Sequence, residues 1–325
     1  MQLTCDFCYH MCSLEEDQKG VCGIRTNQNG QLVTLGYGEL VASAIDPIEK
    51  KPFYHFYPGS TTLSVALFGC NYRCKFCQNY HISQGERVGG RRVSPEQLAH
   101  TLKGSGTPIL SYTYSEPIVW LDYVEACAKE VKRGGGYNCM ITNGSFSKSS
   151  LERILPYIDA FNIDLKGDDQ FYREYCKGRI QPVLDSIETI SQRGDKVLEV
   201  TTLLIEGVHT AEHLKEMAQQ LVERKVRVWH LSRFFPHYQM GTYRQTSEGY
   251  LLELLEVASQ FEIPYIYAGN SNLREWERTR CPACNTTIVT SHNHPLRAKE
   301  EIKTNLDGNH CRQCGHLIYG AFQLD

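Results

Sequence analysis

The sequence lacks any long apolar run. No segment approaches the roughly 18 consecutive apolar residues that a membrane-spanning helix needs. The first residues, MQLTCDFCYHMC, also lack the apolar core of a signal peptide. These two absences predict a cytoplasmic protein that has no membrane as a partner.

Charge of one sign is also scarce. The 34 Lys and Arg residues nearly balance the 37 Asp and Glu residues, which gives a formal net charge of -3. A chain so close to neutrality has no general electrostatic attraction for nucleic acid, and we expect none as a partner. The 325 residues contain neither an internal repeat nor a low-complexity tract, and the 41% hydrophobic content is typical of a globular protein.

Cysteine, by contrast, is abundant, and most of the 14 cysteines fall into three tight groups along the chain. In a reducing compartment such dense groups indicate metal sites rather than disulfides. Cys127, Cys139 and Cys176 lie outside the groups, within apolar helix or strand patterns. We expect these three to be small buried hydrophobes.

Short apolar runs alternate with helical patterns from about residue 62 to about residue 270, which is typical of β/α units on a parallel sheet. The predicted strands are 62–69, 108–114, 138–142, 160–165, 197–205, 226–232 and 263–269. Ser94, Pro95 and Gln97 predict a capped helix start, and Pro117 predicts another. Six or seven units indicate an α/β fold, a partial or nearly closed (β/α) barrel. Chemistry in such a barrel lies at the carboxyl ends of the strands.

Three domains follow from this pattern. We expect a Cys-rich amino-terminal cap and arm over 1–60, the barrel over 61–275, and a zinc-ribbon-like domain over 276–325.

The strongest chemical signal is GCNYRCKFCQN, residues 69–79, directly after the first predicted barrel strand. Cys70, Cys74 and Cys77 can hold one face of a [4Fe–4S] cluster and leave one iron free for the amino and carboxylate groups of a ligand. This spacing, with Phe76 before the last cysteine, resembles the radical S-adenosylmethionine superfamily. The alternative is a zinc site with a distant fourth ligand, although structural zinc sites usually come as paired knuckles.

Polar residues follow the next predicted strands. Glu116, in TYSEP, is placed to receive an ammonium group, or else it offsets the dipole of the helix it precedes. Asn143 in TNG, and Asp164 and Lys166 in DLK, resemble turns of the glycyl-radical activating enzymes that contact the cofactor. Those activases often carry Asp where this chain has Ile141. The alternative for Asp164 and Lys166 is an ion pair without a binding role.

The segment HLSRFFPHY follows the sixth strand and offers His230, Arg233 and His237 to the same rim. A single histidine is more often structural than catalytic, but clustering favours a contact with cofactor or substrate. Asn270, after the last strand, is a weaker candidate that also serves to end the strand.

Both ends of the chain carry further cysteines. The pairs CPAC and CRQC near the carboxyl end resemble a zinc ribbon, with a rubredoxin-like iron site as the lesser alternative; their ligands are Cys281, Cys284, Cys311 and Cys314. The unevenly spaced amino-terminal group fits zinc or an auxiliary iron–sulfur cluster equally well; it comprises Cys5, Cys8, Cys12 and Cys22. A metal there would stabilise a segment too short to build its own core.

Motifs along almost the whole chain resemble one family. They are CDFCYHMC, GVCGIR, DPIEKKPFYHFYPGS, GCNYRCKFCQN, TYSEP, FNIDLKG, FFP, YAGN and the terminal knuckles. Together they resemble the AmmeMemoRadiSam system radical SAM enzymes, which are similar in their barrel to pyruvate formate-lyase activating enzymes.

The resemblance implies an enzyme that cleaves S-adenosylmethionine reductively and abstracts hydrogen from an unidentified substrate. It implies a flavodoxin or ferredoxin as electron donor, and AMMECR1-domain and Memo-type proteins as partners. We expect cofactor contacts from Phe76, Glu116, Asn143, Asp164, Lys166, His230 and His237.

Two other functions remain open. An activase for a glycyl-radical protein is one, although the accessory cysteines lie at the chain ends and not directly after the triad. A non-catalytic metal-binding assembly factor is the other, although such a factor has no need of polar residues at the strand ends.

Overall fold

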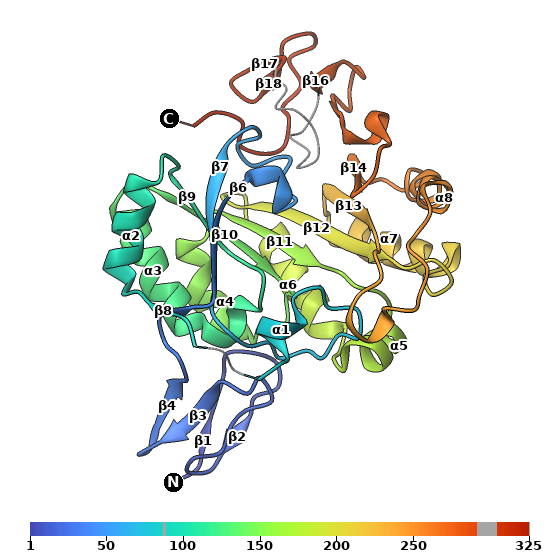
Figure 1. The fold of residues 1–325 in the computed structure, drawn as a ribbon. Coiled ribbons are helices and arrows are strands. Elements are labelled where there is room, and N and C mark those ends of the chain that lie inside the picture. Colours follow the sequence, from blue (N-terminus) through green and yellow to red (C-terminus); the bar gives the residue numbers. More distant parts are fainter. Residues whose placement is uncertain (87–88, 291–303, 325) are drawn as a thin grey trace.

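A curved, mostly parallel sheet organises the computed structural model, which describes residues 1–86, 89–290 and 304–324 (Figure 1). Its parallel strands are β7 (Thr61–Ala66), β9 (Ile109–Tyr112), β10 (Tyr137–Thr142), β11 (Ala160–Asp164), β12 (Val197–Leu204), β13 (Val228–Arg233) and β14 (Tyr265–Gly269). They pair in chain order, and β6 (Ala42–Pro47) adds an antiparallel edge beside β7. Because β14 and β6 are the two edges, the barrel is open, and the predicted α/β partial barrel is confirmed.

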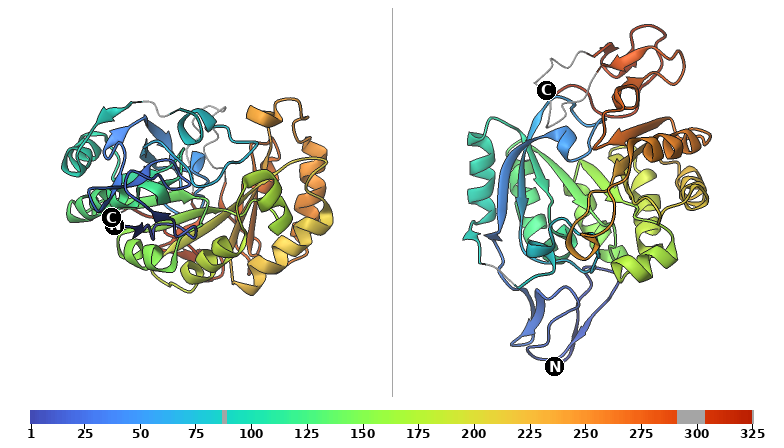
Figure 2. Two further views of the ribbon diagram at one scale, coloured as in Figure 1. Left: turned by 90° about the horizontal axis from the view of Figure 1, so that it is seen from below. Right: turned by 45° about the vertical axis from the view of Figure 1, so that its right-hand side comes forward.

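The longer helices follow the strands and cover the outer side of the sheet (Figure 2). They are α2 (Pro95–Gly104), α3 (Leu121–Arg133), α4 (Lys148–Ile154), α6 (Gln181–Ser191), α7 (Ala211–Glu223) and α8 (Glu248–Ala258). Two short helices, α1 (Tyr80–Ser83) and α5 (Asp169–Phe171), lie in the segments that follow β7 and β11. The predicted capping box at Ser94 is present, because Ser94 and Gln97 each accept from the other's backbone N–H.

Short helical turns supplement them: η1 (Ile48–Lys50), η2 (Pro117–Trp120), η3 (Leu155–Tyr157), the π-helical η4 (Tyr172–Cys176), η5 (Tyr238–Met240) and η6 (Arg274–Glu277). The predicted helix at Pro117 thus begins as the turn η2 and continues as α3.

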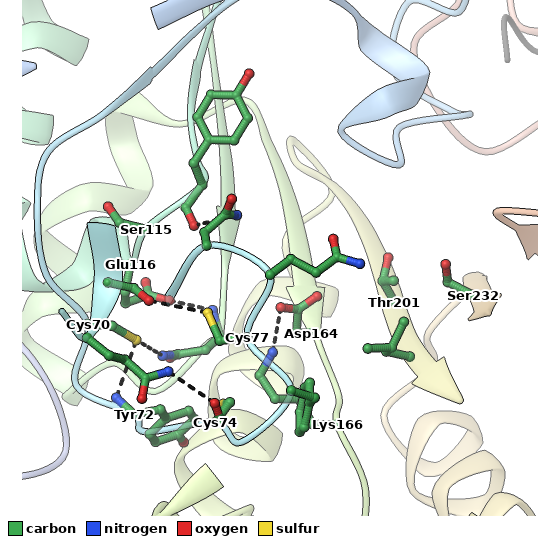
Figure 3. A pocket seen from close by; sticks show the side chains of 18 of the residues that line it. Cys70, Tyr72, Cys74, Cys77, Ser115, Glu116, Asp164, Lys166, Thr201 and Ser232 are labelled. Atoms are coloured by element: carbon green, nitrogen blue, oxygen red, sulfur yellow. Dashed lines mark hydrogen bonds and ion pairs between the residues drawn. The ribbon is translucent and has the colours of Figure 1, made fainter. Parts of the chain in front are cut away.

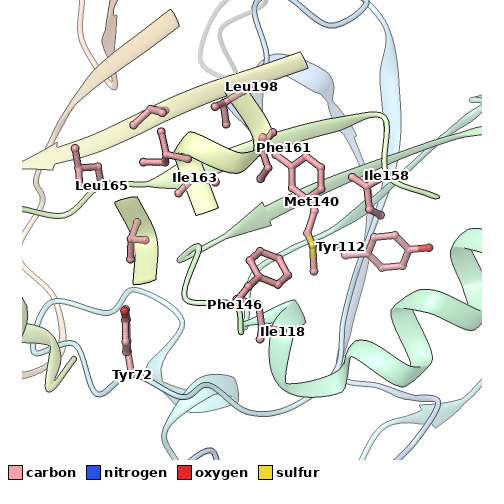
Figure 4. Packing of buried hydrophobic residues seen from close by; sticks show 14 of the residues in the cluster. Tyr72, Tyr112, Ile118, Met140, Phe146, Ile158, Phe161, Ile163, Leu165 and Leu198 are labelled. Atoms are coloured by element: carbon pink, nitrogen blue, oxygen red, sulfur yellow. The ribbon is translucent and has the colours of Figure 1, made fainter. Parts of the chain in front are cut away.

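The main hydrophobic core lies between the sheet and these helices. Tyr112, Met140 and Phe161, from three neighbouring strands, are completely buried there (Figure 4). Cys127, Cys139 and Cys176 are also fully buried, as the sequence predicts. Within the described residues, no helix is both long enough and apolar enough to span a membrane.

Small sheets at the two chain ends lie at opposite ends of the barrel (Figures 1 and 2). The amino-terminal pairs are β1 (Leu3–Thr4) with β2 (Ser13–Leu14), and β3 (Arg25–Gln28) with β4 (Gln31–Thr34). The carboxyl-terminal pairs are β15 (Thr279–Arg280) with β16 (Thr287–Val289), and β17 (Leu306–Asp307) with β18 (His310–Cys311). A further short pair joins β5 (Glu39–Leu40) to β8 (Arg91–Arg92).

Contacts show which barrel end each segment meets. The backbone of Cys8 bridges to Phe146, just beyond the carboxyl end of β10. In the carboxyl-terminal segment, the Tyr319 hydroxyl accepts a hydrogen bond of 2.7 Å from the N–H of Leu198, near the start of β12. The amino-terminal cysteines therefore lie at the barrel end where strand-end chemistry is expected, and the carboxyl-terminal cysteines lie at the other.

A buried carboxylate fastens the arm before β7 to the barrel interior. Glu199, on β12, accepts backbone N–H bonds from Tyr54 (3.0 Å) and His55 (2.8 Å). Its other oxygen lies 2.6 Å from His230 Nε2 on β13. Since Glu199 is fully buried, these hydrogen bonds hold the arm against the amino-terminal halves of β12 and β13.

Candidate active site

The loop that follows β7 presents the three predicted cluster thiols to one cleft (Figure 3). The N–H of Tyr72 donates to Cys70 Sγ at 3.3 Å, and the Ser83 hydroxyl lies 3.2 Å from Cys77 Sγ. The Arg73 guanidinium donates to the carbonyl of Cys70 at 2.6 Å and to that of Val21 at 2.7 Å. These bonds hold the loop in a fixed shape and join it to the amino-terminal cap.

Without a metal, the environment of these thiols opposes ionisation. Burial raises the pKa of Cys70 well above its usual value, and burial likewise raises the pKa of Cys77. The pKa of Cys74 is raised mainly by its interaction with Cys176 and, to a lesser degree, by burial. A bound cationic metal offsets such a penalty and deprotonates its thiol ligands, so the donor set fits an iron–sulfur cluster.

Cys176 packs against the triad loop, although the sequence predicts only a buried hydrophobe. It ends the π-helical turn η4, and its carbonyl accepts from the N–H of Arg73 at 2.8 Å. π-Helical turns are rare and often lie at functional sites. No local pattern links Cys176 to the triad, because only the fold brings the two segments together.

Glu116 joins the ends of β9 and β10. Its carboxylate accepts from the N–H of Ile118 (3.1 Å), the Thr142 hydroxyl (2.6 Å) and the N–H of Asn143 (2.8 Å). Burial raises its pKa to about 7, despite these hydrogen bonds. Glu116 therefore fits both interpretations of the sequence: it caps the start of η2, and it also lines the cleft.

Asn143 reaches from the TNG turn toward the triad. Its amide donates to Asn71 Oδ1 at 2.9 Å and lies 4.0 Å from Cys70 Sγ. The next residue must be glycine, because Gly144 has a φ of +71° and an added Cβ would meet Ile163 Cγ2 at 2.7 Å. The tight turn thus sets the Asn143 amide beside the cluster loop.

Asp164 and Lys166 form an ion pair of 2.7 Å on the wall of the cleft. The Lys166 ammonium also lies 6.0 Å from the centre of the Phe76 ring. Although burial opposes its charge, the carboxylate of Asp164 and the thiol of Cys74 hold the pKa of Lys166 well above its usual range. The ion pair that the sequence offers as an alternative is therefore present, and both of its members also face the cleft.

The cleft, of about 260 Å³, is open to a deeper chamber of about 550 Å³ inside the barrel. Thr201, Ser232 and Tyr114 line both parts, and none of them is among the predicted site residues. Polar residues at alternate positions of otherwise apolar strands are the signal for Thr201 and Ser232. Asn270 also lines the cleft and donates to the Ser232 hydroxyl at 2.9 Å.

β13 and the turn after it do not bring their three predicted residues to one rim, which corrects the sequence expectation. His230 lines only the deeper chamber and bonds to Glu199. Arg233 lies on the opposite face of the strand and pairs with Glu248 at 2.6 Å. His237 is exposed on the turn that leads away and lines neither part of the cleft.

The carboxyl-terminal cysteines form a compact four-sulfur group. Cys281 Sγ lies 3.6 Å from Cys314 Sγ, and Cys284 Sγ lies 3.8 Å from Cys311 Sγ. A tetrahedral zinc ion with Zn–S bonds of about 2.3 Å sets its sulfurs about 3.8 Å apart. The group therefore has the geometry to bind a single metal ion.

The amino-terminal cysteines also converge, but with a different geometry. Three of them are buried, whereas Cys12 is half-buried. Burial raises the pKa of Cys8 to about 12, and the nearby thiols of Cys22 and Cys5 add to this rise. Over residues 1–86, 89–290 and 304–324, only the carboxyl-terminal group brings three or more potential ligand atoms within 4.8 Å of one another.

Known proteins support the geometric assignment. The model of the radical SAM superfamily matches residues 65–221. The uncharacterized protein MJ0808 of Methanocaldococcus jannaschii is 34% identical over 327 residues, which cover 98% of this chain and 95% of that protein. The GTP 3′,8-cyclase of Aeromonas hydrophila is 25% identical over 53% of this chain and 52% of that enzyme.

A solved structure shares the fold. Streptococcus suis SuiB bound to S-adenosylmethionine superposes with a TM-score of 0.51 at 14% identity, over 70% of this chain. The matched region spans 53% of SuiB, about half its length. At this identity the likeness extends to the fold alone.

Proposed function

Because the chain belongs to the radical SAM superfamily and is a radical SAM enzyme, we propose that it is of the AmmeMemoRadiSam type and acts through the cleft beside Cys70, Cys74 and Cys77. The observation that carries this proposal is the cleft itself, where the three thiols face polar side chains from the ends of the parallel strands. When bound, a [4Fe–4S] cluster and S-adenosylmethionine supply a one-electron cleavage that yields a 5′-deoxyadenosyl radical.

The residues around the triad position these groups. Cys70, Cys74 and Cys77 hold the cluster, and Arg73 keeps the loop against the cap through its carbonyl bonds. Glu116 accepts from the ammonium of the amino acid, while the Asn143 amide donates toward the cluster loop. Glu116 fits this role because the bonds it already accepts fix its carboxylate at the cleft wall.

The opposite wall binds the remainder of the cofactor. Asp164 offers carboxylate oxygens to hydroxyl groups, and Lys166 offers its ammonium to a carboxylate. Phe76 is buried against Phe171, with ring centres 5.6 Å apart, and closes the cleft floor. The deeper chamber lies next to this wall and would receive the substrate.

The remaining assignments rest on resemblance and geometry. We infer a flavodoxin or ferredoxin as electron donor, AMMECR1-domain and Memo-type proteins as partners, and a cytoplasmic location. Sulfur spacings near 3.8 Å favour zinc in the carboxyl-terminal group. Its contacts at the amino-terminal ends of the strands support a structural role for that zinc.

An anaerobic cleavage assay tests the proposal. The protein is reconstituted with iron and sulfide, reduced with dithionite, and supplied with S-adenosylmethionine. We expect 5′-deoxyadenosine from the wild type and from Cys127→Ala, a buried cysteine outside the cleft, and none from Cys74→Ala. Equal product from Cys74→Ala would refute the proposal, and no product from any protein would favour the assembly factor.

A second measurement separates the substrate enzyme from the activase. Deuterium transfer from a labelled small molecule into 5′-deoxyadenosine supports direct hydrogen abstraction. A glycyl radical signal in a partner protein supports the activase instead.

A further inference from the structure

We propose that Cys5, Cys8, Cys12 and Cys22 bind a second iron–sulfur cluster, which lies beside the first. The site itself stands apart from the proposed function, whereas its position next to the first cluster rests on that function. Three observations carry the proposal.

The first observation is that the cap folds so that it presents four thiols together. The N–H of Cys5 donates to the carbonyl of Cys12 at 2.8 Å, which closes the loop between β1 and β2 around Cys8. The turn that carries Cys22 is closed by a bond of 2.8 Å from the N–H of Gly23 to the carbonyl of Gly20. A cap of paired short strands has little core of its own, so a metal centre supplies stability that it otherwise lacks.

Backbone donors already point at sulfur in this group. The N–H of Arg25 donates to Cys22 Sγ at 3.4 Å. The same kind of bond, from Tyr72 N–H to Cys70 Sγ at 3.3 Å, occurs in the triad loop. Hydrogen bonds to ligand sulfurs set the potential of iron–sulfur clusters, so the amino-terminal group and the triad share a cluster-binding feature.

The second observation is the sulfur spacing, which differs between the two ends of the chain. The carboxyl-terminal thiols lie at distances that suit one tetrahedral ion, with all four ligand atoms within 4.8 Å of one another. No three of the amino-terminal thiols, nor the triad, meet that limit in the described chain. A cubane cluster is larger than a single ion and sets its thiolates farther apart, so the spacing favours a cluster over zinc.

The third observation is the position of the group beside the triad. Asn71, which is buried, lies against the cap: its backbone carbonyl is 3.3 Å from Nε2 of His10, and its amide donates to the Ser145 hydroxyl at 2.7 Å. Its Oδ1 accepts from the Asn143 amide at 2.9 Å, and that amide lies 4.0 Å from Cys70 Sγ. The N–H of Tyr9 also donates to the carbonyl of Ser145 at 3.1 Å. These contacts therefore set the cap next to the loop that carries the triad.

Metal analysis of the full chain tests the site without relying on cleavage activity. A variant in which Cys70, Cys74 and Cys77 are all changed to alanine leaves the cap intact. After anaerobic reconstitution we expect about four iron and four sulfide per chain in this variant, and about eight of each in the wild type. We expect about one zinc per chain in both, at the carboxyl-terminal group.

The opposite outcome is equally clear. A triad-less variant that holds no iron, but about two zinc per chain, would overturn the proposal. The triad-less variant cannot cleave S-adenosylmethionine whatever the cap binds, so this result is independent of the proposed function. Mössbauer spectra of the same sample distinguish a cluster from adventitious iron, and a spectrum of adventitious iron alone would also overturn the proposal.

Discussion

Replacing Glu116 with glutamine should lower the stability of the protein and remove the pH dependence that its buried carboxylate gives to stability and to cofactor binding. Its two oxygens accept from two backbone N–H groups and one hydroxyl, and the side chain is 3% exposed. A glutamine amide has only one oxygen, so one backbone N–H loses its acceptor. An unpaired buried donor costs about 1 to 3 kcal/mol of folding free energy.

The same substitution removes a pH dependence. The pKa of Glu116 is raised from 4.5 to about 7 in the folded protein, so the folded state holds its proton more tightly than the unfolded chain. The contribution of Glu116 to stability is therefore greatest below pH 4.5 and falls as the pH rises through 7. Linkage gives a loss of about 1.3 kcal/mol between pH 6 and pH 8 for the wild type, and this loss should vanish in Glu116→Gln.

Urea unfolding of the metal-free proteins at pH 6 and pH 8 measures both effects. Glu216→Gln is the control, because Glu216 is exposed on α7. Anaerobic calorimetry of the reconstituted proteins then tests binding. If the ionised carboxylate receives an ammonium group, affinity for S-adenosylmethionine rises from pH 6 to pH 8 in the wild type but not in the variant. An undiminished slope of stability with pH in Glu116→Gln would refute the reasoning.

Three further predictions concern other parts of the molecule. Glu199→Ala should lower the free energy of unfolding by about 3 to 5 kcal/mol, because it leaves buried partners such as His230 without their hydrogen-bond acceptor. A loss below about 1 kcal/mol, measured by urea unfolding, would contradict this. Cys284→Ala should abolish zinc binding but leave the iron content unchanged in elemental analysis, since the two centres lie at opposite barrel ends; a matched loss of iron would refute the separation. His237→Ala should form 5′-deoxyadenosine at the wild-type rate, because His237 lies outside the cleft; a tenfold loss would show otherwise.

Local patterns in the sequence were sufficient for the framework of the fold. Short apolar runs that alternate with helical patterns predict all seven parallel strands, and the Ser94 capping box depends only on neighbours along the chain. The sequence also predicts the triad, because three thiols within one loop indicate a metal site without any distant residue. Pro117 and the glycine of TNG likewise encode their turns directly.

Contacts between distant segments were decided by the tertiary structure alone. Cys176 meets Arg73 of the triad loop, and Asn71 lies between His10 and Asn143, only because the π-helical turn and the cap fold against that loop. His237 follows the strand that carries His230, yet the chain turns away after β13 and leaves His237 outside the cleft. A sequence pattern records the period and the caps of each element, whereas the distance between two elements is set by how the whole core packs.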